Sequence, residues 1–214
     1  MKTQIITIKK LKKDGSIDAS ITDLVSMIII DGKMVLMPVD SIYGIVSTPD
    51  QRSHSAIERL TGDRDQEIVR MISSFKMLDE IAMISKMEFD FLHRIWPGEL
   101  IVYVRDIKNP GRAIPVRMPK SKYLQDVIER VGRPLVYSAL NDANRRPVFR
   151  KKDIVTALDG KIECLLIIEE FGKEHALPSV VDISSGALDI INEGRVSAEE
   201  IKSLYFLGKD DSVM

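Results

Sequence analysis

Short apolar runs alternate with segments of helical periodicity along almost the whole chain, and this alternation constrains the fold more than any other feature. Residues 34–37 and 165–168 have the length and composition of buried strands, whereas apolar residues recur at helical spacing over 21–29 and 124–131. No linker rich in proline, glycine or serine and no internal repeat interrupts the alternation. The sequence therefore predicts an α/β fold, a mixed sheet covered by helices in a single domain.

The boundaries of the predicted elements follow from periodicity and from turn residues. Strands are predicted over 3–8, 34–37, 68–72, 100–104, 113–118, 135–137, 165–168, 180–183 and 190–191. Helices are predicted over 21–29, 53–60, 76–84, 88–95, 121–131 and 154–158, with a last one that opens at a capping box over 197–200. Ser53 and Ser121 stand where N-caps belong, and Gly32 and Gly132 where helices end. We expect one domain over 1–208 and a frayed tail over 209–214.

Composition excludes several classes of protein. The chain has 214 residues, of which 44% are hydrophobic, and a net charge of −1, so it is not a basic nucleic-acid binder by composition, although a local basic face stays open. Its single cysteine, Cys164, lies in an apolar run, which excludes an intramolecular disulfide and predicts a buried thiol. His54, His93 and His175 lack the spacing of metal ligands, so we expect no metal site built on them.

The sequence carries no sign of export or of a membrane. Its first residues lack the apolar core of a signal peptide, and no stretch approaches the roughly 18 apolar residues of a membrane span. We therefore expect a cytoplasmic protein without a membrane partner.

Polar stretches adjoin four of the predicted strands, at residues 40–44, 117–119, 138–141 and 179–182. Any one of them is more often a turn or a cap than a ligand site. Ligands of open α/β sheets bind beyond the strand ends, however, so the joint occurrence of the four predicts a polar ligand cleft.

Five motifs, in order along the chain, resemble those of the YrdC-like family. Residues 38–44, Pro-Val-Asp-Ser-Ile-Tyr-Gly, resemble its Pro-Thr-Asp-Thr-x-Tyr-Gly motif. Residues 96–100 resemble its Trp-Pro-Gly-Pro-Leu, 116–119 its Val-Arg-x-Pro, 138–141 its Thr-Ser-Ala-Asn, and 178–182 its Ser-Thr-Val-Val-Asp. The resemblance implies a twisted, open, YrdC-like α/β fold with a concave and often basic cleft.

The resemblance also implies an activity. Members of the family are threonylcarbamoyl-AMP synthases, which condense L-threonine, bicarbonate and ATP to threonylcarbamoyl-adenylate for the N6-threonylcarbamoyl modification of tRNA adenosine. The partners implied are ATP, with Mg²⁺, L-threonine, bicarbonate, and tRNA or double-stranded RNA. Such a reaction needs close positioning of the amino acid and cationic groups around the phosphates.

The family motifs carry roles over to individual residues. Ser41 and Tyr43 would line the threonine and nucleotide pocket, Arg64 and Arg117 would face phosphate or carboxylate as the catalytic cations, and Ser138, Asn141 and Ser179 would contact the adenylate. Arginine suits such anions because its planar fork grips two oxygens. A surface ion pair is the alternative for either arginine.

Several polar positions of the family are altered. The Lys-x-Arg of the family is reduced to Arg64, while Val39, Ile101 and Asn192 replace two threonines and an arginine. Loss of one transition-state donor costs about 10²–10³ in rate. Three hypotheses follow: an active synthase, a homologue that binds nucleotide or RNA without catalysis, and a carbamoyl-type adenylation of a different amine.

A local basic stretch includes Arg145, Arg146 and Lys151. Its functional interpretation is contact with RNA or with triphosphate. Its alternative is a solvated loop that leads into the next helix.

Overall fold

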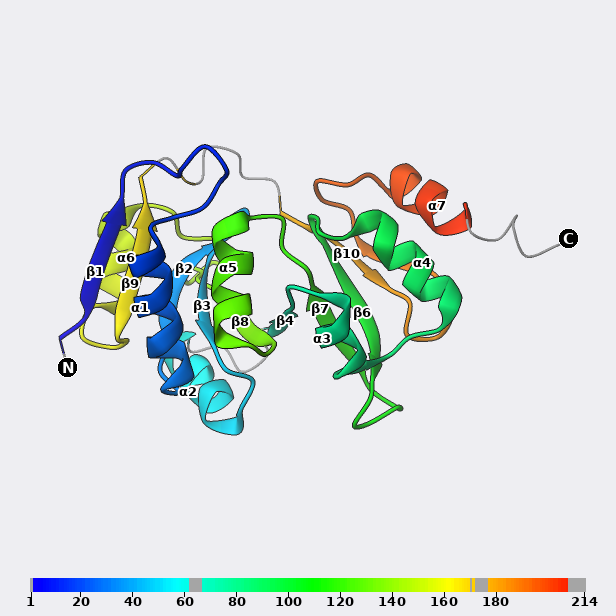
Figure 1. Ribbon diagram of the computed structural model, residues 1–214, viewed down its shortest axis with the longest axis horizontal. Helices are drawn as coiled ribbons and strands as arrows, with labels where there is room; N and C mark the ends of the chain where they lie inside the picture. Colours follow the sequence, from blue (N-terminus) through cyan, green and yellow to red (C-terminus); the bar gives the residue numbers. More distant parts are fainter. Residues whose placement is uncertain (1, 62–66, 170, 172–176, 208–214) are drawn as a thin grey trace, which may run out of the picture. The chain divides into compact units, whose positions relative to one another are not determined.

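The computed structural model describes residues 2–61, 67–169, 171 and 177–207, and the chain forms two compact units (Figure 1). The first unit contains residues 1–71 and 121–175, and the second contains 72–120 and 176–214. Each unit is thus built from two separate stretches of sequence. That the whole of 1–208 acts as one domain stays a prediction.

The first unit is a mixed sheet. Its strand order is β1 (Gln4–Ile8), β9 (Cys164–Ile168), β2 (Val35–Val39), β3 (Ile42–Ser47), β8 (Leu135–Ala139) and β4 (Val69–Met71). The pairs β1–β9 and β9–β2 are parallel, and the remaining pairs are antiparallel. The carboxyl ends of β1, β9 and β2 therefore lie at the same edge of the sheet.

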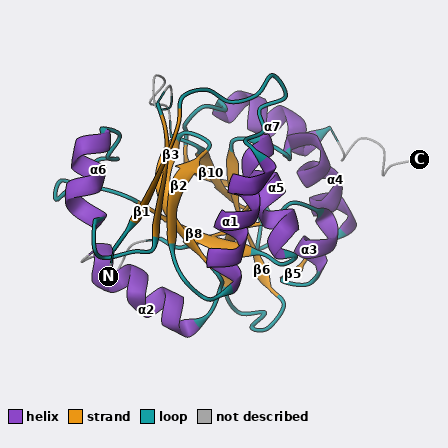
Figure 2. Ribbon diagram, turned by 60° about the vertical axis from the view of Figure 1, so that its left-hand side comes forward, coloured by secondary structure: helices purple, strands orange, loops and turns teal. Residues whose placement is uncertain are grey.

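Helices cover both faces of this sheet (Figure 2). On one face α1 (Ala19–Ile30) packs against α5 (Lys122–Val131), and on the other lie α2 (Gln51–Thr61) and α6 (Lys151–Leu158). Side chains from β2, β3, β9, α2 and α6 form one buried apolar cluster. Burial of this apolar surface is the main force that holds the layers together.

The second unit contains further strands and has a core of its own. Its strands run in the order β7 (Ala113–Arg117), β6 (Leu100–Asp106), β10 (Ser179–Asp182) and β11 (Asp189–Asn192), with β5 (Ala82–Met83) paired to β6. Its helices are α3 (Phe75–Asp79), α4 (Lys86–Ile95) and α7 (Ala198–Phe206). A second apolar cluster joins the strands to these helices. The predicted α/β fold with a mixed sheet is confirmed.

Two parts of the predicted secondary structure are wrong. The polar stretch 40–44 is not a loop, because β3 begins at Ile42 and only Asp40 and Ser41 form the turn of a tight hairpin. All six residues of β3 are buried, so the strand lacks the alternation by which sequence analysis finds strands. The helix predicted over 76–84 ends at Asp79, and the following residues form β5.

The predicted helix ends are partly confirmed. Gly132 ends α5 with φ 76°, and the Ser197 hydroxyl accepts a hydrogen bond from the Glu200 amide at 3.2 Å. Ser53 is not an N-cap, because α2 begins at Gln51. The Asp50 carboxylate instead accepts the Ser53 amide at 2.8 Å. Hydrogen bonds from Thr48 and Ser53 to this carboxylate lower the pKa of Asp50.

The close packing around Gly44 explains why the motif at residues 38–44 contains a glycine. A Cβ atom there would lie 2.9 Å from Val39 Cγ2 and 3.0 Å from Tyr137 Cδ2. We expect Gly44→Ala to lower the free energy of unfolding by about 1–3 kcal/mol, because β2 and β8 flank β3 and the two side chains are packed. Urea unfolding followed by circular dichroism measures the change, and an unaltered midpoint would contradict it.

Other expectations concern single groups. Cys164 is fully buried, as predicted, and burial raises the pKa of its thiol to about 11. Across the described residues, no group of three or more His, Cys, Asp or Glu side chains is placed to hold a metal ion. Within the same ranges, every helix is too short or too polar to cross a bilayer.

Candidate functional site

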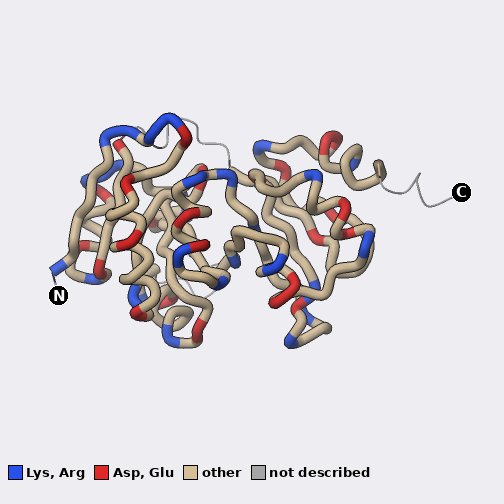
Figure 3. Tube along the Cα trace, viewed as in Figure 1, with Lys and Arg blue, Asp and Glu red and all other residues tan. Residues whose placement is uncertain are grey.

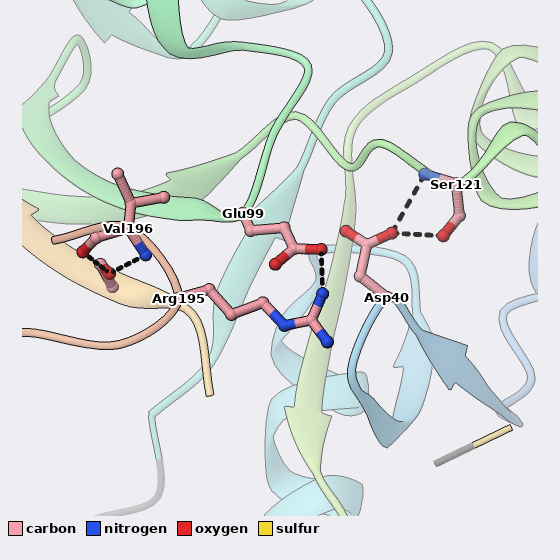
Figure 4. A network of polar contacts seen from close by, with 6 residues as sticks. Asp40, Glu99, Ser121, Arg195 and Val196 are labelled. Carbon is pink, nitrogen blue, oxygen red and sulfur yellow. Dashed lines mark hydrogen bonds and ion pairs between the residues drawn. The ribbon is translucent and has the colours of Figure 1, made fainter. Parts of the chain in front are cut away.

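The Asp40–Ser41 turn is anchored to the first turn of α5. Asp40 has φ 52°, a conformation that aspartate tolerates better than most residues. Its Oδ1 accepts the Ser121 amide at 3.0 Å and also accepts the Ser121 hydroxyl (Figure 4). Ser121 therefore does not cap α5 with its own side chain. The Asp40 carboxylate lies at the positive end of the helix dipole instead, which stabilises its charge.

Ser41 is the most informative of the predicted site residues. Ser41 is only 7% exposed, and its Oγ has no hydrogen-bond partner in the described part of the chain. An unsatisfied buried hydroxyl costs about 1–3 kcal/mol, so such groups call for an explanation. Ser26 and Ser53 share this property but lie within helices, whereas Ser41 lies on a turn beyond a strand end. A polar ligand is the explanation that the position of Ser41 favours.

Tyr43 supports the site from within the core. Its hydroxyl donates to the Ile168 carbonyl at 3.3 Å and accepts the Ile168 amide at 3.2 Å. Its ring meets Phe171 edge to face with centroids 4.9 Å apart, and burial raises the pKa of its phenol. Tyr43 thus ties β3 to the end of β9, and its predicted contact with a ligand stays a prediction.

A cavity of about 610 Å³ opens beside this turn. It lies where the parallel strands β1, β9 and β2 end, the usual place for ligands in such sheets. Its polar lining comes from three lysines, one carboxylate and two hydroxyl side chains, and its apolar lining from two aliphatic residues and a phenylalanine. These residues, together with Gly15, are Lys10, Lys12, Lys13, Asp40, Ser121, Tyr123, Leu11, Ile168 and Phe171.

The three lysines are not among the predicted site residues. Lys and Arg positions gather on the turn between β1 and α1 (Figure 3). The signal in the sequence is a run of lysines over 9–13 directly after a predicted strand. By itself such a run indicates only a charged turn. The sequence does not give the order of the strands, and this order decides which residues lie next to the run.

Ser138 and Asn141 lie on and after β8. Ser138 pairs with Ile45 of β3 and is fully buried, and its hydroxyl donates to the Glu67 carbonyl at 3.4 Å. Asn141 is half-buried and forms a β-bridge with Pro147. Ser41, Tyr43 and Ser138 therefore share one hairpin and its neighbouring strand.

The basic stretch lies on a surface loop and the helix that follows it. Arg145 and Arg146 are exposed, and the Asp142 carboxylate accepts the Arg146 amide at 2.9 Å. The ammonium group of Lys151, on α6, donates to the Thr7 hydroxyl at 3.0 Å. None of these three residues lines the cavity.

Ser179, in the second unit, forms hydrogen bonds that hold a neighbouring backbone segment in place. Its hydroxyl donates to the Val196 carbonyl at 2.6 Å and accepts the amides of Gly194 and Val196 at 2.9 and 3.0 Å. It thereby fastens residues 194–196 to β10. Ser179 has these three bonds already, so its predicted contact with an adenylate stays a prediction.

Arg117 and Ser179 lie on opposite faces of the strands in the second unit. Ser179 pairs with Leu100, and Val116 pairs with Val102, so both belong to the face that carries the apolar cluster. Arg117, one residue further along β7, faces the other way because side chains alternate along a strand. It is fully buried. Arg64 lies outside the described residues.

Arg195 is a cation that sequence analysis missed, and it lies in the second unit. The family's late arginine is replaced by Asn192, but Arg195 follows Gly194 directly and its Nη1 lies 3.0 Å from Glu99 Oε1 (Figure 4). Glu99 stands where the family motif has its second proline. The pair is only partly exposed.

Solved structures with the same fold are known. Sua5 of P. abyssi complexed with L-threonine has 22% sequence identity and a TM-score of 0.81 over 94% of this chain and 61% of Sua5. YciO of E. coli has 16% identity and a TM-score of 0.79 over 93% of this chain and 98% of YciO. Full-length HypF in its phosphate- and nucleotide-bound form has 14% identity and a TM-score of 0.69 over 81% of this chain and 29% of HypF.

These likenesses show the fold, and this chain spans about 60% of the length of the Sua5 structures that it matches. A family model settles membership more directly. The model of Sua5, YciO and YrdC, which bears the description telomere recombination, matches residues 27–194 and therefore most of the chain. On this ground, with the five ordered motifs and the shared fold, the chain belongs to the Sua5/YciO/YrdC family.

Proposed function

We propose that this protein binds L-threonine and ATP and condenses them with bicarbonate to threonylcarbamoyl-adenylate, for the modification of tRNA adenosine. The observation that carries the proposal is the buried Ser41 hydroxyl, which lacks a partner among the described residues and lies in the family's first motif. The adjoining cavity has three lysines for the phosphates of ATP. A related protein, Sua5 of P. abyssi, has been solved with L-threonine.

The proposed reaction joins three substrates in two bond-forming steps. The threonine amine attacks the carbon of bicarbonate, and loss of water leaves a carbamate. A carbamate oxygen then attacks the α-phosphorus of ATP, and the bond to the β-phosphate oxygen breaks to release pyrophosphate. Negative charge builds on the phosphates during this second step, so nearby cations lower its barrier.

The protein's own residues have separate tasks in this proposal. The Ser41 hydroxyl hydrogen-bonds the amino acid, and the lysine side of the cavity stabilises the phosphates. Mg²⁺ would accompany ATP as its usual counterion. The described residues contain no carboxylate cluster that fits this ion, so we derive no step from it.

Pyrophosphate release tests the proposal. We expect release only when L-threonine, bicarbonate and ATP are present together, and omission of any one should return the rate to background. Replacement of threonine by other amino acids in the same assay tests the alternative acceptor amine. Folded protein that releases no pyrophosphate with any amino acid would refute the synthase.

A second candidate is binding of tRNA or double-stranded RNA without catalysis. The exposed Arg145 and Arg146, on one loop, favour it. Binding through phosphate contacts should weaken steeply as salt rises. Titration of labelled tRNA at low and high salt tests this, and absence of binding at low salt would exclude it.

A further inference from the structure

The segment between β1 and α1 contributes three lysines to the lining of the cavity, but neither of its two carboxylates. Lys10, Lys12 and Lys13 all line the cavity beside Asp40. Asp14, in the same turn, lines a different pocket, and hydrogen bonds from Ser16 lower the pKa of its carboxyl. The cavity is therefore lined by three positive charges of this segment, whereas Asp14 and Asp18 do not line it.

Hydrogen bonds within the turn fix its shape. The Lys12 amide donates to the Ser16 carbonyl at 2.9 Å, and the Gly15 amide donates to the Lys12 carbonyl at 3.0 Å. Asp14 Oδ1 accepts both the amide and the hydroxyl of Ser16, at 3.0 and 2.7 Å. Gly15 has φ 79°, which suits glycine. A turn held in this way presents its lysines at low entropic cost to a ligand.

Among the described residues, few groups offset the lysine charges at the cavity. Lys10 and Lys13 have no ion-pair partner among the residues that the structure describes, and Lys12 pairs with Asp18 only at the surface. Such exposed pairs contribute little. The one carboxylate in the lining, Asp40, already accepts two hydrogen bonds from Ser121. An anion at the lysines would therefore gain attraction from the ammonium groups of both Lys10 and Lys13.

Part of the cavity lining is apolar. Leu11, Ile168 and Phe171 form it, and Phe171 is held against Tyr43. A volume of about 610 Å³ suits a small organic ligand rather than a bare ion. A nucleotide has both parts that such a cavity would accommodate, a flat apolar base and a chain of phosphates.

We infer that Lys10 and Lys13 bind the phosphates of ATP. The inference rests on the proposed function, since it locates the nucleotide of that reaction. It assigns a positioning role to a segment that precedes residues 27–194, the region matched by the family model. None of the five motifs includes either lysine.

Calorimetric titration of the full chain with ATP, AMP and adenosine tests the inference. Lys10→Ala/Lys13→Ala should weaken ATP binding by about 100-fold, roughly tenfold for each lost charge-assisted hydrogen bond. Adenosine binding should be unchanged, since only phosphates meet the lysines. Lys10→Arg/Lys13→Arg, which keeps both charges, should recover most of the ATP affinity.

A charge-matched control separates contact from general electrostatics. Lys2→Ala/Lys9→Ala removes the same charge from exposed positions that do not line the cavity, and it should leave ATP affinity nearly unaltered. Equal losses in the two double variants, or equal losses for ATP and adenosine, would overturn the inference. So would absence of ATP binding by folded wild-type protein.

The two proposals fail in different ways. ATP binding that depends on the lysines, without pyrophosphate release in the presence of threonine and bicarbonate, would refute the synthase and support the nucleotide site. Pyrophosphate release that is equally fast in wild type and Lys10→Ala/Lys13→Ala would support the synthase and overturn the nucleotide site.

Discussion

Ser41→Ala is expected to abolish most L-threonine binding while leaving the ligand-free protein at least as stable as the wild type. A hydrogen bond to a charged group of the amino acid contributes about 1.5–3 kcal/mol, which corresponds to roughly 10- to 100-fold in affinity. The same hydroxyl has no partner among the described residues of the ligand-free protein, so its removal relieves a desolvation cost. Titration with L-threonine and thermal unfolding measure the two effects.

Ser26→Ala is the matched control for Ser41→Ala. Ser26 is fully buried in α1, and its hydroxyl also lacks a hydrogen-bond partner within the described residues. We expect this variant to resemble Ser41→Ala in stability and the wild type in threonine binding. If Ser41→Ala bound threonine as tightly as Ser26→Ala does, the hydroxyl of the first motif would have no part in recognition.

Gly194→Ala is expected to cause a larger loss of stability than Gly44→Ala. A Cβ atom at this position would lie 2.3 Å from the Leu177 carbonyl oxygen and 2.7 Å from the backbone of Pro178. Both contacts are to backbone, which cannot rotate away as a side chain can. The clash can be relieved only if residues 194–196 move. The three hydrogen bonds of the Ser179 hydroxyl to this segment would then also weaken.

The cost of Gly194→Ala should be about 3 kcal/mol or more, at the upper end for overpacked sites. Gly111→Ala serves as the control, because the nearest contact of its Cβ would be 3.6 Å from the Asn109 side chain. Chemical denaturation of both variants measures the difference. Similar midpoints for the two would contradict the close approach at Gly194 and the structural role assigned to this glycine.

The family motifs in this chain separate into two kinds once their contacts are known. Gly44 and Gly98 are required by close packing, since a Cβ at each would meet atoms at 3.0 Å or less. Ser179 holds backbone in place. Ser41 has no such task among the described residues. At most of these positions the motif residue is therefore explained by its role in the fold. Ser41 is the motif residue whose position favours contact with a ligand.

Features that arise from neighbouring residues could be predicted from the sequence. Helical periodicity, the Gly132 C-cap and the Ser197 cap depend on contacts a few residues apart, and all three were predicted. The burial of Cys164 followed from an apolar run. The motifs also indicated the α/β fold of the family, because their order along the chain can be compared without knowledge of the structure.

Which distant residues contact one another depends on the tertiary fold. The bond between Asp40 and Ser121 joins residues 81 positions apart, and the cavity combines lysines of the first turn with the ends of β2 and β9. Strand order places those ends side by side, and no local pattern encodes it. β3 is buried on both faces, so a search for alternating apolar residues does not find it. The lysines are recognised as part of a cavity only when the positions of the strands are known.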